Sequence, residues 1–299
     1  MPEVHWIFFD LPYWMRFWEN GRRGEHLYYY LWQLAIYFVI KRIHKKEKFD
    51  LVHHVTFACH WMPCFLALLN LPLLWSPVGG GETAPKPFYQ TSSYRARIYE
   101  YLRDFARWQG EINPFVRLTA SKAKLGLAAT TETEARMKLM GCKRVRVLPS
   151  VALSEEDMAV LLSLAIRRSS PFRFLSVGRL LHFKGFHLEL EAFSRFQKHF
   201  PASEYWVIGD GPEIKSLRHL ADILGISQKV IFWGILPGYI VLEKLGHCDV
   251  LVHPSLHESV GCVILEAMAA GRPAICLNIG GPALQITDKT GFKIEAINP

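Results

Sequence analysis

Hydrophobic residues in the second half of the chain fall into short continuous runs, separated by longer stretches with helical spacing. The continuous runs predict strands at Phe172–Val177, Tyr205–Ile208, Val230–Trp233, Val250–His253 and Pro273–Leu277. The stretches between them predict helices at Phe186–Phe200, from Pro212 to Gly225 and at Gly261–Ala270. They also predict a short helix that ends near Gly246. Strands that alternate with helices in this way predict βαβ units and a parallel sheet.

The first half repeats this pattern less regularly. It predicts strands at Val4–Phe9, Leu51–Val55, Leu73–Trp75 and Val145–Leu148, and helices at Tyr28–Lys46 and Arg95–Trp108. The segment Val151–Ser170 carries an acidic run and then a basic one, which is typical of a join between domains. We therefore predict an α/β protein with an N-terminal domain at 1–160 and a C-terminal domain at 161–299.

Composition excludes some classes of protein. Half of the 299 residues are hydrophobic and 21% are charged, which excludes a disordered chain. The net charge of +8 suits an anionic partner such as nucleotide phosphates, nucleic acid or an acidic membrane. The basic residues form no patch interleaved with aromatic residues, so we expect no nucleic-acid partner.

The six cysteines form no CxxC motif and no tight framework, which indicates a reducing, cytoplasmic location. No signal peptide is predicted at the start of the sequence, and the apolar stretches Leu31–Ile40 and Met62–Trp75 are too short or too interrupted to span a bilayer. The helix at Tyr28–Lys46 ends in a basic run. It either covers a sheet, which we favour, or lies on an anionic membrane as a peripheral contact.

The clearest chemical signal follows the predicted strand Val250–His253. A loop there carries Glu258, a helix begins near Gly261, and Glu266 lies inside that helix on an otherwise apolar segment. In an open parallel sheet, ligands bind beyond the carboxyl ends of the strands. A helix N-terminus suits an anion, and a carboxylate on an apolar segment needs hydrogen-bond donors such as sugar hydroxyls.

The spacing of Glu258 and Glu266 resembles the E-x7-E element of retaining glycosyltransferases of the GT-B fold, and the stretch around it resembles glycosyltransferase family 4 (glycosyl transferases group 1). Further elements of that family match in order: Ser176–Arg179 with Lys184-Gly185, Gly209–Pro212, Asp249 with Pro254-Ser255, and Gly280-Gly281. The resemblance implies two Rossmann-like, doubly wound parallel-sheet domains that face a cleft.

The resemblance also implies a role for each matching residue. Arg179 and Lys184 would hold the donor diphosphate, Glu258 the transferred sugar and Glu266 the ribose. The implied donor site comprises Gly178, Arg179, Lys184, Gly209, Gly211, Gly234, Glu258, Ser259, Gly261, Val263 and Glu266. The implied catalytic residues are Glu258, Arg179, Lys184 and His54.

Two segments of the first half resemble the acceptor side of this family. Asp50–Thr56 supplies a histidine at a strand end, either His53 or His54, and Pro77–Glu82 supplies a glycine loop with Gly79 and Gly80. A histidine hydrogen bonded for purely structural reasons is an equal alternative. No Asp-x-Asp pair, HExxH motif or Walker A sequence occurs, so we expect no metal and no cofactor besides the nucleotide-sugar substrate.

The expected activity is that of a hexosyltransferase (EC 2.4), which moves a sugar from a UDP- or GDP-sugar to a hydroxyl of a glycan, a lipid-linked acceptor or a small molecule, in polysaccharide or glycolipid synthesis. The glycine loop that opens the family and its last helices are not found, so we expect a chain truncated at both ends. The alternatives are a non-catalytic nucleotide-sugar binder or degenerate fragment, and, less favoured, an epimerase or phosphorylase of the same fold.

Overall fold

The computed structural model describes residues 4–16, 24–55, 59–89, 93–164 and 171–297. The chain divides into two compact units. The first unit comprises residues 1–80, 105–128 and 133–148, and the second comprises 81–104, 129–132 and 149–299. The units therefore exchange short segments along the sequence. The predicted boundary at residue 160 divides the chain into two continuous ranges, and it stays a prediction.

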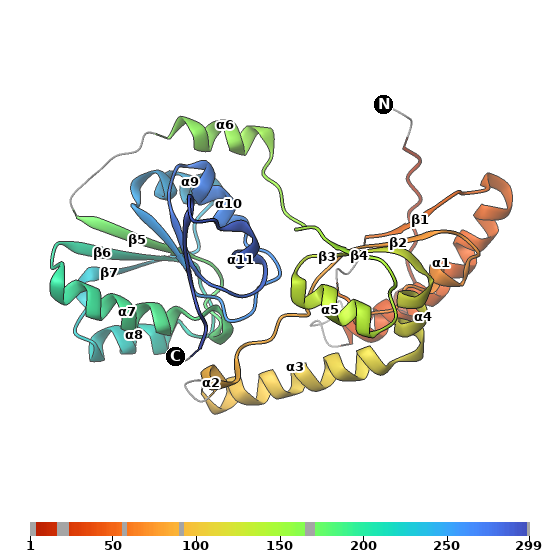
Figure 1. Ribbon diagram of the computed structural model, residues 1–299, viewed down its shortest axis with the longest axis horizontal. Helices are drawn as coiled ribbons and strands as arrows, with labels where there is room; N and C mark the ends of the chain where they lie inside the picture. Colours follow the sequence, from red (N-terminus) through yellow and green to blue (C-terminus); the bar gives the residue numbers. More distant parts are fainter. Residues whose placement is uncertain (1–3, 17–23, 56–58, 90–92, 165–170, 298–299) are drawn as a thin grey trace. The chain divides into compact units, whose positions relative to one another are not determined.

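The first unit contains a parallel sheet of four strands in the order β1-β2-β3-β4 (Figure 1). The strands are β1 (Val52–His54), β2 (Leu73–Val78), β3 (Ala123–Ala128) and β4 (Val145–Val147). Its helices are α1 (Glu25–Glu47), α4 (Pro114–Lys122) and α5 (Thr131–Leu139), together with the second part of α3 (Tyr94–Ile112). Its core joins Leu73, Trp75 and Val78 of β2 to side chains of α4 and α5.

The second unit contains a parallel sheet of six strands in the order β10-β9-β8-β5-β6-β7. The strands are β5 (Phe172–Val177), β6 (Ser203–Ile208), β7 (Val230–Gly234), β8 (Val250–His253), β9 (Ala274–Leu277) and β10 (Gly291–Ile294). The helices are α2 (Lys86–Tyr89), α6 (Glu155–Ser163), α7 (Phe186–His199), α8 (Ile214–Ile223), α9 (Gly238–His247), α10 (Cys262–Ala269) and α11 (Gly280–Gln285).

Both faces of the six-stranded sheet are covered, because alternate strand residues point to opposite sides. On one face Tyr205 and Val207 pack with α7 and α8, and on the other Trp206 and Ile208 pack with α6, α9 and α10. Figure 1 shows these two groups of helices on opposite sides of the sheet. A sheet buried on both faces explains the continuous apolar runs that predicted its strands.

The predicted elements of the second half are present within one or two residues of their expected ends. In the first half, the predicted strand Val4–Phe9 is wrong. That segment pairs with no described strand, and Trp6 and Phe8 are 78% and 93% exposed. An apolar run forms a strand only where a neighbouring strand accepts its backbone hydrogen bonds.

The helix predicted at Tyr28–Lys46 is α1, and it packs against the core of the first unit. Tyr29, Gln33 and Ile36 are buried, and Tyr37 and Ile40 lie against the core cluster. The structure therefore supports the interpretation of α1 as a helix that covers a sheet. Its last turn carries His44, Lys45 and Lys46, whose charge complements the helix dipole.

Candidate active site

The strand order of the second unit creates a switch point between β5 and β8. From β5 the chain adds β6 and β7 on one side of the sheet, and β8, β9 and β10 on the other. The loops that follow β5 and β8 therefore leave in opposite directions and open a crevice at the carboxyl ends of the strands. Ligands of doubly wound sheets bind at such points.

The two loops at this switch point touch through their backbones. The Leu256 amide donates a 2.7 Å hydrogen bond to the Phe183 carbonyl. Gly185 has a φ of +73°, and a Cβ placed on it would overlap the Pro254 carbonyl oxygen. Glycine is therefore required at residue 185 for both backbone conformation and space.

This contact brings together two of the predicted site residues, Lys184 and Glu258. The Lys184 ammonium forms an ion pair with the Glu258 carboxylate, and both side chains are less than one fifth exposed. His253 Nε2, at the end of β8, lies 3.6 Å from the same carboxylate oxygen. Burial alone would raise the pKa of Glu258, but His253 and Lys184 outweigh it and lower that pKa. Glu258 is therefore a carboxylate at neutral pH.

A glycine pair from the next loop fixes the backbone of Glu258. The Gly281 amide donates a 2.8 Å hydrogen bond to the Glu258 carbonyl. Gly280 has a φ of +61°, and a Cβ on it would overlap that carbonyl oxygen, while a Cβ on Gly281 would overlap the Ser259 carbonyl. The Gly280-Gly281 pair therefore allows the loop after β9 to approach the loop that carries Glu258.

The predicted glycines of the donor site line the carboxyl ends of β5, β6 and β7. The Gly178 amide donates to the Ile208 carbonyl at 3.0 Å, and the Gly209 amide donates to the Gly234 carbonyl at 2.8 Å. A Cβ on Gly209 would overlap the Gly178 carbonyl, and a Cβ on Gly211 would lie 2.5 Å from the Leu180 carbonyl oxygen. These loops are packed backbone to backbone, which leaves the edge of the sheet open to a ligand.

Arg179 and the start of α10 offer positive charge beside this edge. Arg179 is exposed, and no hydrogen bond or ion pair of its guanidinium is found within the described part of the chain. Helix α10 begins after Gly261, which caps it without a side-chain hydrogen bond. The first amides of that helix, up to Val263, are therefore available to an anion.

Glu266 lies in the second turn of α10 and is half-buried. Burial raises its pKa, and the neighbouring Asp157 carboxylate of α6 adds to the effect. Glu266 belongs to the same unit as Glu258, but within the described residues no hydrogen bond or ion pair joins the two side chains. A half-buried carboxylate of this kind suits a ligand group that donates hydrogen bonds, such as a ribose hydroxyl.

Glu82 is a further charged group at this site, and sequence reasoning did not place it there. The Ser259 hydroxyl donates a 2.6 Å hydrogen bond to Glu82 Oε2, and Thr130 donates to the other carboxylate oxygen. Glu132 accepts a 2.9 Å hydrogen bond from the Gly280 amide. The segments 81–104 and 129–132 thus belong to the second unit because they hold its site loops. Only the position of Glu82 after three glycines hinted at such a role.

Glu100 is a further carboxylate that holds the site loops. Its Oε1 lies 2.8 Å from His182 Nε2 and 3.2 Å from His257 Nε2, and its side chain is 3% exposed. Burial would raise the pKa of Glu100, but hydrogen bonds from the two histidines and the charge of Arg103 lower it to about 2. His182 and His257 flank Lys184 and Glu258 in sequence, so this carboxylate ties the two site loops to one helix.

A buried polar network lies beneath the switch point. Ser176 Oγ lies 2.9 Å from Glu189 Oε1, 2.7 Å from the Tyr205 hydroxyl and 2.6 Å from the Val252 carbonyl oxygen, and Tyr205 also donates to Glu189. Full burial raises the pKa of Glu189 well above its ordinary value. The network joins α7 to β5, β6 and β8 immediately before their site loops begin.

The predicted acceptor-side residues lie in the first unit. His54 is buried, and its Nε2 lies 3.3 Å from the Tyr29 hydroxyl of α1. His53 points to the other face of β1 and is exposed, with Nε2 3.4 Å from Ser76 Oγ. Strand alternation therefore separates the two candidates and makes His53 the accessible one.

The glycine loop of the first unit rests on a histidine that sequence reasoning missed. His60 is fully buried, with Nδ1 3.1 Å from the Gly79 carbonyl oxygen and Nε2 3.0 Å from Glu111 Oε1. Gly80 has a φ of +87°, and a Cβ there would lie 2.5 Å from the Trp61 ring. No sequence signal singles out His60, because its partner Glu111 lies 51 residues away.

Parallel α/β sheets with glycine-lined loops at a switch point define a class of nucleotide- and sugar-binding folds. Comparison with known proteins is more specific. Residues 166–299 match the model of the family Glycosyl transferases group 1. This part of the chain is therefore similar to the group 1 glycosyltransferases.

Curated relatives extend the similarity to more of the chain. The 2-deoxystreptamine N-acetyl-D-glucosaminyltransferase of Streptomyces fradiae is 28% identical over 84% of this chain and 60% of its own length. The lipopolysaccharide core biosynthesis glycosyltransferase LpsE of Rhizobium meliloti is 39% identical over 40% of this chain and 34% of its own length. The chain thus spans less than two thirds of either relative.

Solved structures show the same fold. The lipopolysaccharide outer core galactosyltransferase WaaB superposes with a TM-score of 0.59 at 17% identity, over 88% of this chain and 67% of that one. Sucrose-phosphate synthase of Thermosynechococcus elongatus gives 0.61 at 21% identity, over 90% and 66%. Together with the two parallel α/β sheets, these similarities confirm the predicted GT-B, Rossmann-like fold class.

Two further features are absent from the described residues. None of the helices in those residues combines the length and apolar character needed to cross a membrane. No group of three or more His, Cys, Asp or Glu side chains there is arranged to hold a metal ion.

Proposed function

We propose that this chain carries the donor site of a retaining glycosyltransferase, which transfers a sugar from a nucleoside-diphosphate sugar to a hydroxyl acceptor. The observation that carries the proposal is the meeting of Lys184 and Glu258 at the switch point of the six-stranded sheet. The match of residues 166–299 to the family model supports the reaction class, and the name of the Rhizobium meliloti relative supports a context in lipopolysaccharide synthesis.

Charge supports the assignment of the donor diphosphate. Arg179 is exposed beside Gly178, and the first amides of α10 point out of the helix start. We assign the pyrophosphate to Arg179, Lys184 and the amides after Gly261, since fixed cations and helix amides stabilise charge on a departing nucleotide. These groups supply the positive charge of the site from the protein itself.

The sugar and ribose are assigned to carboxylates. Glu258 is ionised and already accepts a hydrogen bond from Lys184, so it can accept hydrogen bonds from sugar hydroxyls in the same way. Glu266 takes the ribose, and the nucleobase lies beside Gly234, at the end of β7. Contacts to the nucleobase decide between uracil and guanine.

Calorimetric titration of the protein with UDP, GDP and ADP tests the proposal. We expect one nucleotide to saturate one site, with Arg179→Ala and Glu266→Ala each weakening it about tenfold or more. Lys198→Ala, an exposed cation in the last turn of α7, serves as the control and is expected to bind normally. A folded protein that binds none of the three nucleotides would contradict the donor site.

Non-catalytic binding of a nucleotide sugar is the second candidate. It would use the same contacts to the nucleotide sugar, so binding alone does not separate it from transfer. Release of UDP or GDP from the sugar nucleotide in the presence of acceptor separates the two: turnover supports the transferase, and tight binding without turnover supports the binder. The predicted peripheral membrane contact is a further proposal, tested by sedimentation with anionic vesicles.

A further inference from the structure

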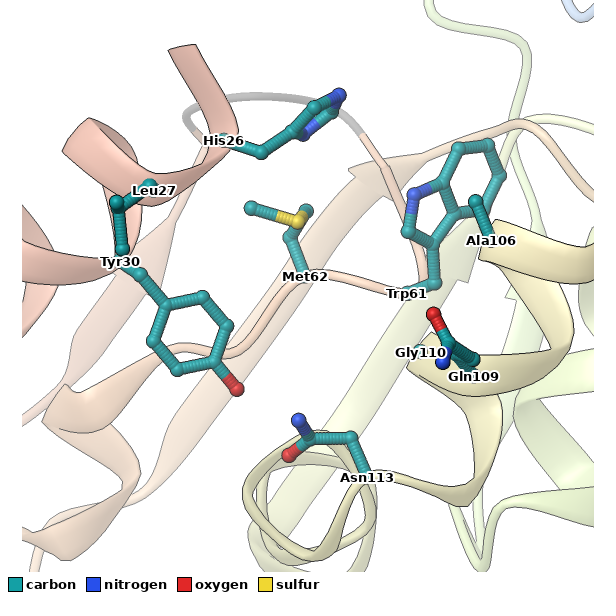
Figure 2. A pocket seen from close by; sticks show the side chains of 9 residues that line it. All are labelled: His26, Leu27, Tyr30, Trp61, Met62, Ala106, Gln109, Gly110 and Asn113. Carbon is teal, nitrogen blue, oxygen red and sulfur yellow. The ribbon is translucent and has the colours of Figure 1, made fainter. Parts of the chain in front are cut away.

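A pocket of about 360 Å³ opens in the first unit (Figure 2). It is lined by His26, Leu27, Tyr30, Trp61, Met62, Ala106, Gln109, Gly110 and Asn113. These residues come from the start of α1, the loop after β1, the end of α3 and the residue that caps α4. None of the lining residues is Lys, Arg, Asp or Glu, so the pocket is not built for a phosphate.

The pocket has the position in its own sheet that ligand sites usually have. Helices α1 and α4 precede the parallel strands β1 and β3, so their first residues lie at the carboxyl ends of those strands. The loop that carries Trp61 leaves β1 at the same edge. Open parallel sheets bind ligands at this edge, and the volume lies within the range of small-molecule sites.

The lining combines two aromatic rings with two amides. Trp61 stands on one side of the pocket and Tyr30 on the other, and the Tyr30 hydroxyl points toward the Asn113 amide (Figure 2). Burial raises the pKa of Tyr30, although the Asn113 amide opposes this, so the hydroxyl keeps its proton. Flat rings suit the C–H faces of a pyranose, and amides suit its hydroxyl groups, because each amide both donates and accepts.

The Asn113 amide is oriented by the helix that it caps. Its Oδ1 accepts a 2.9 Å hydrogen bond from the Phe115 amide, as an N-cap side chain does. With its oxygen committed to α4, the Nδ2 group faces Tyr30 and the pocket (Figure 2). The fold therefore presents a hydrogen-bond donor of fixed direction inside the pocket.

Trp61 is held in place by two glycines and a histidine. A Cβ on Gly80 would lie 2.5 Å from the Trp61 ring, and a Cβ on Gly110 would lie 2.6 Å from Trp61 Cβ. The ring of His60 meets Trp61 edge to face, with centroids 5.0 Å apart. The aromatic wall is therefore rigid, and it adjoins the predicted acceptor loop at Gly80.

We propose that this pocket binds a pyranose ring of a carbohydrate acceptor, with the ring against Trp61 and its hydroxyls on Gln109 and Asn113. The proposal rests on the proposed function and specifies the acceptor as a sugar. A lipid chain is disfavoured because amides line the pocket, and a nucleotide is disfavoured because no lysine or arginine does.

Tryptophan indole signals in NMR spectra of ¹⁵N-labelled protein test the site. The probes are the methyl α-pyranosides of glucose, galactose and N-acetylglucosamine, each titrated alone. We expect at least one glycoside to move the Trp61 signal, identified from Trp61→Phe, in a saturable way. Gln109→Ala is expected to weaken that binding about threefold or more, and Gly110→Ala, which displaces Trp61, about tenfold.

Trp108→Ala is the matched control, because Trp108 lies on the same helix, is exposed and does not line the pocket. It is expected to bind the glycoside normally. The proposal is overturned if no glycoside moves the Trp61 signal, or if binding survives both Gln109→Ala and Gly110→Ala in folded protein.

Titration with UDP and GDP in the same samples separates the two proposals. Nucleotide binding with no glycoside binding would overturn the acceptor pocket and leave the donor site standing. Glycoside binding with no nucleotide binding would contradict the proposed function while supporting a sugar site in the first unit.

Discussion

The carboxyl ends of the two parallel sheets present different chemistry. In the second unit, strand order reverses at β5 and β8, and charged side chains of two loops meet there as Lys184, Glu258 and His253. In the first unit, the strands follow one another in chain order, and the pocket at that edge is lined by aromatic and amide side chains. The two parallel sheets thus carry charged side chains at this edge in one unit and a neutral pocket in the other.

The loops, more than the sheet, decide which side chains gather at this edge. In the second unit, glycines let backbones touch, so that polar side chains from neighbouring loops converge. In the first unit, Gly80 and Gly110 make room for one indole ring, which forms the wall of a pocket. Four predictions test this comparison.

The largest effect is expected from removing charge at the switch point. Glu258→Gln keeps the shape of the side chain but removes the carboxylate, and Lys184→Met removes its partner. We expect sugar transfer by the protein to fall about 100-fold or more for each, since fixed charges at a developing charge contribute that much. Lys45→Met, an exposed cation of α1 in the first unit, is the control, with a change of less than about twofold. Normal turnover in Glu258→Gln would remove Glu258 from the reaction.

Close backbone approach in the second unit is tested by two glycines of similar φ. Gly280 (φ +61°) faces the Glu258 carbonyl, whereas a Cβ on Gly225 (φ +69°) would meet nothing within 4 Å. Gly225→Ala is expected to lower the free energy of unfolding by about 1 kcal/mol, from backbone strain alone. Gly280→Ala is expected to cost about 2–4 kcal/mol, because the overlap must also be relieved. Urea unfolding measures both, and equal losses would contradict the close-approach argument.

The buried network beneath the switch point gives the next effect. The pKa of Glu189 is raised, so its contribution to stability is fully present below the ordinary pKa near 4.5 and is lost as pH rises through the raised value. Glu189→Gln is expected to abolish this pH dependence with a change of less than about 1 kcal/mol at pH 5. Glu189→Leu leaves Ser176 and Tyr205 without their shared partner, and it is expected to cost about 2 kcal/mol. Thermal unfolding between pH 5 and pH 9 distinguishes them.

Glu100 is expected to show the opposite pH dependence. Its pKa is about 2 in the folded protein, so its contribution is present above the ordinary pKa near 4.5 and is lost as pH falls from about 4.5 toward 2. Glu100→Gln is expected to lose about 1–2 kcal/mol at pH 7, with the difference from the parent protein shrinking below pH 4. Glu243→Gln, an exposed carboxylate of α9, is the control with no such trend. A constant difference at all pH values would contradict the charge argument.

Local sequence predicted most of the second unit because its elements are bounded by local signals. The strand Phe172–Val177 and the strand Val250–His253 were predicted with the ends that they have in the structure. In the first unit, β3 (Ala123–Ala128) was missed. Its Ala and Leu residues favour helices, and Gly126 is explained only by the close approach of Met137 and Cys142.

Some charged residues of the site were predicted from the sequence, and others were not. Lys184 and Glu258 were predicted because the segments that carry them resemble those of family 4 glycosyltransferases. In the structure the adjacent parallel strands β5 and β8 bring their loops together. Glu82 lies 177 residues before its partner Ser259, and Glu100 lies 82 and 157 residues before its partners His182 and His257. No pattern along the chain encodes those pairings.

The alternation of strands and helices and the glycines at the strand ends could be predicted from the sequence, because these depend on hydrophobic period and short-range backbone conformation. The tertiary structure alone decided that Val4–Phe9 is not a strand, that His53 is exposed while His54 is buried, and that His60 supports Gly79. Each of these depends on which distant segment packs against the residue, and that is fixed only when the sheets and their helices assemble.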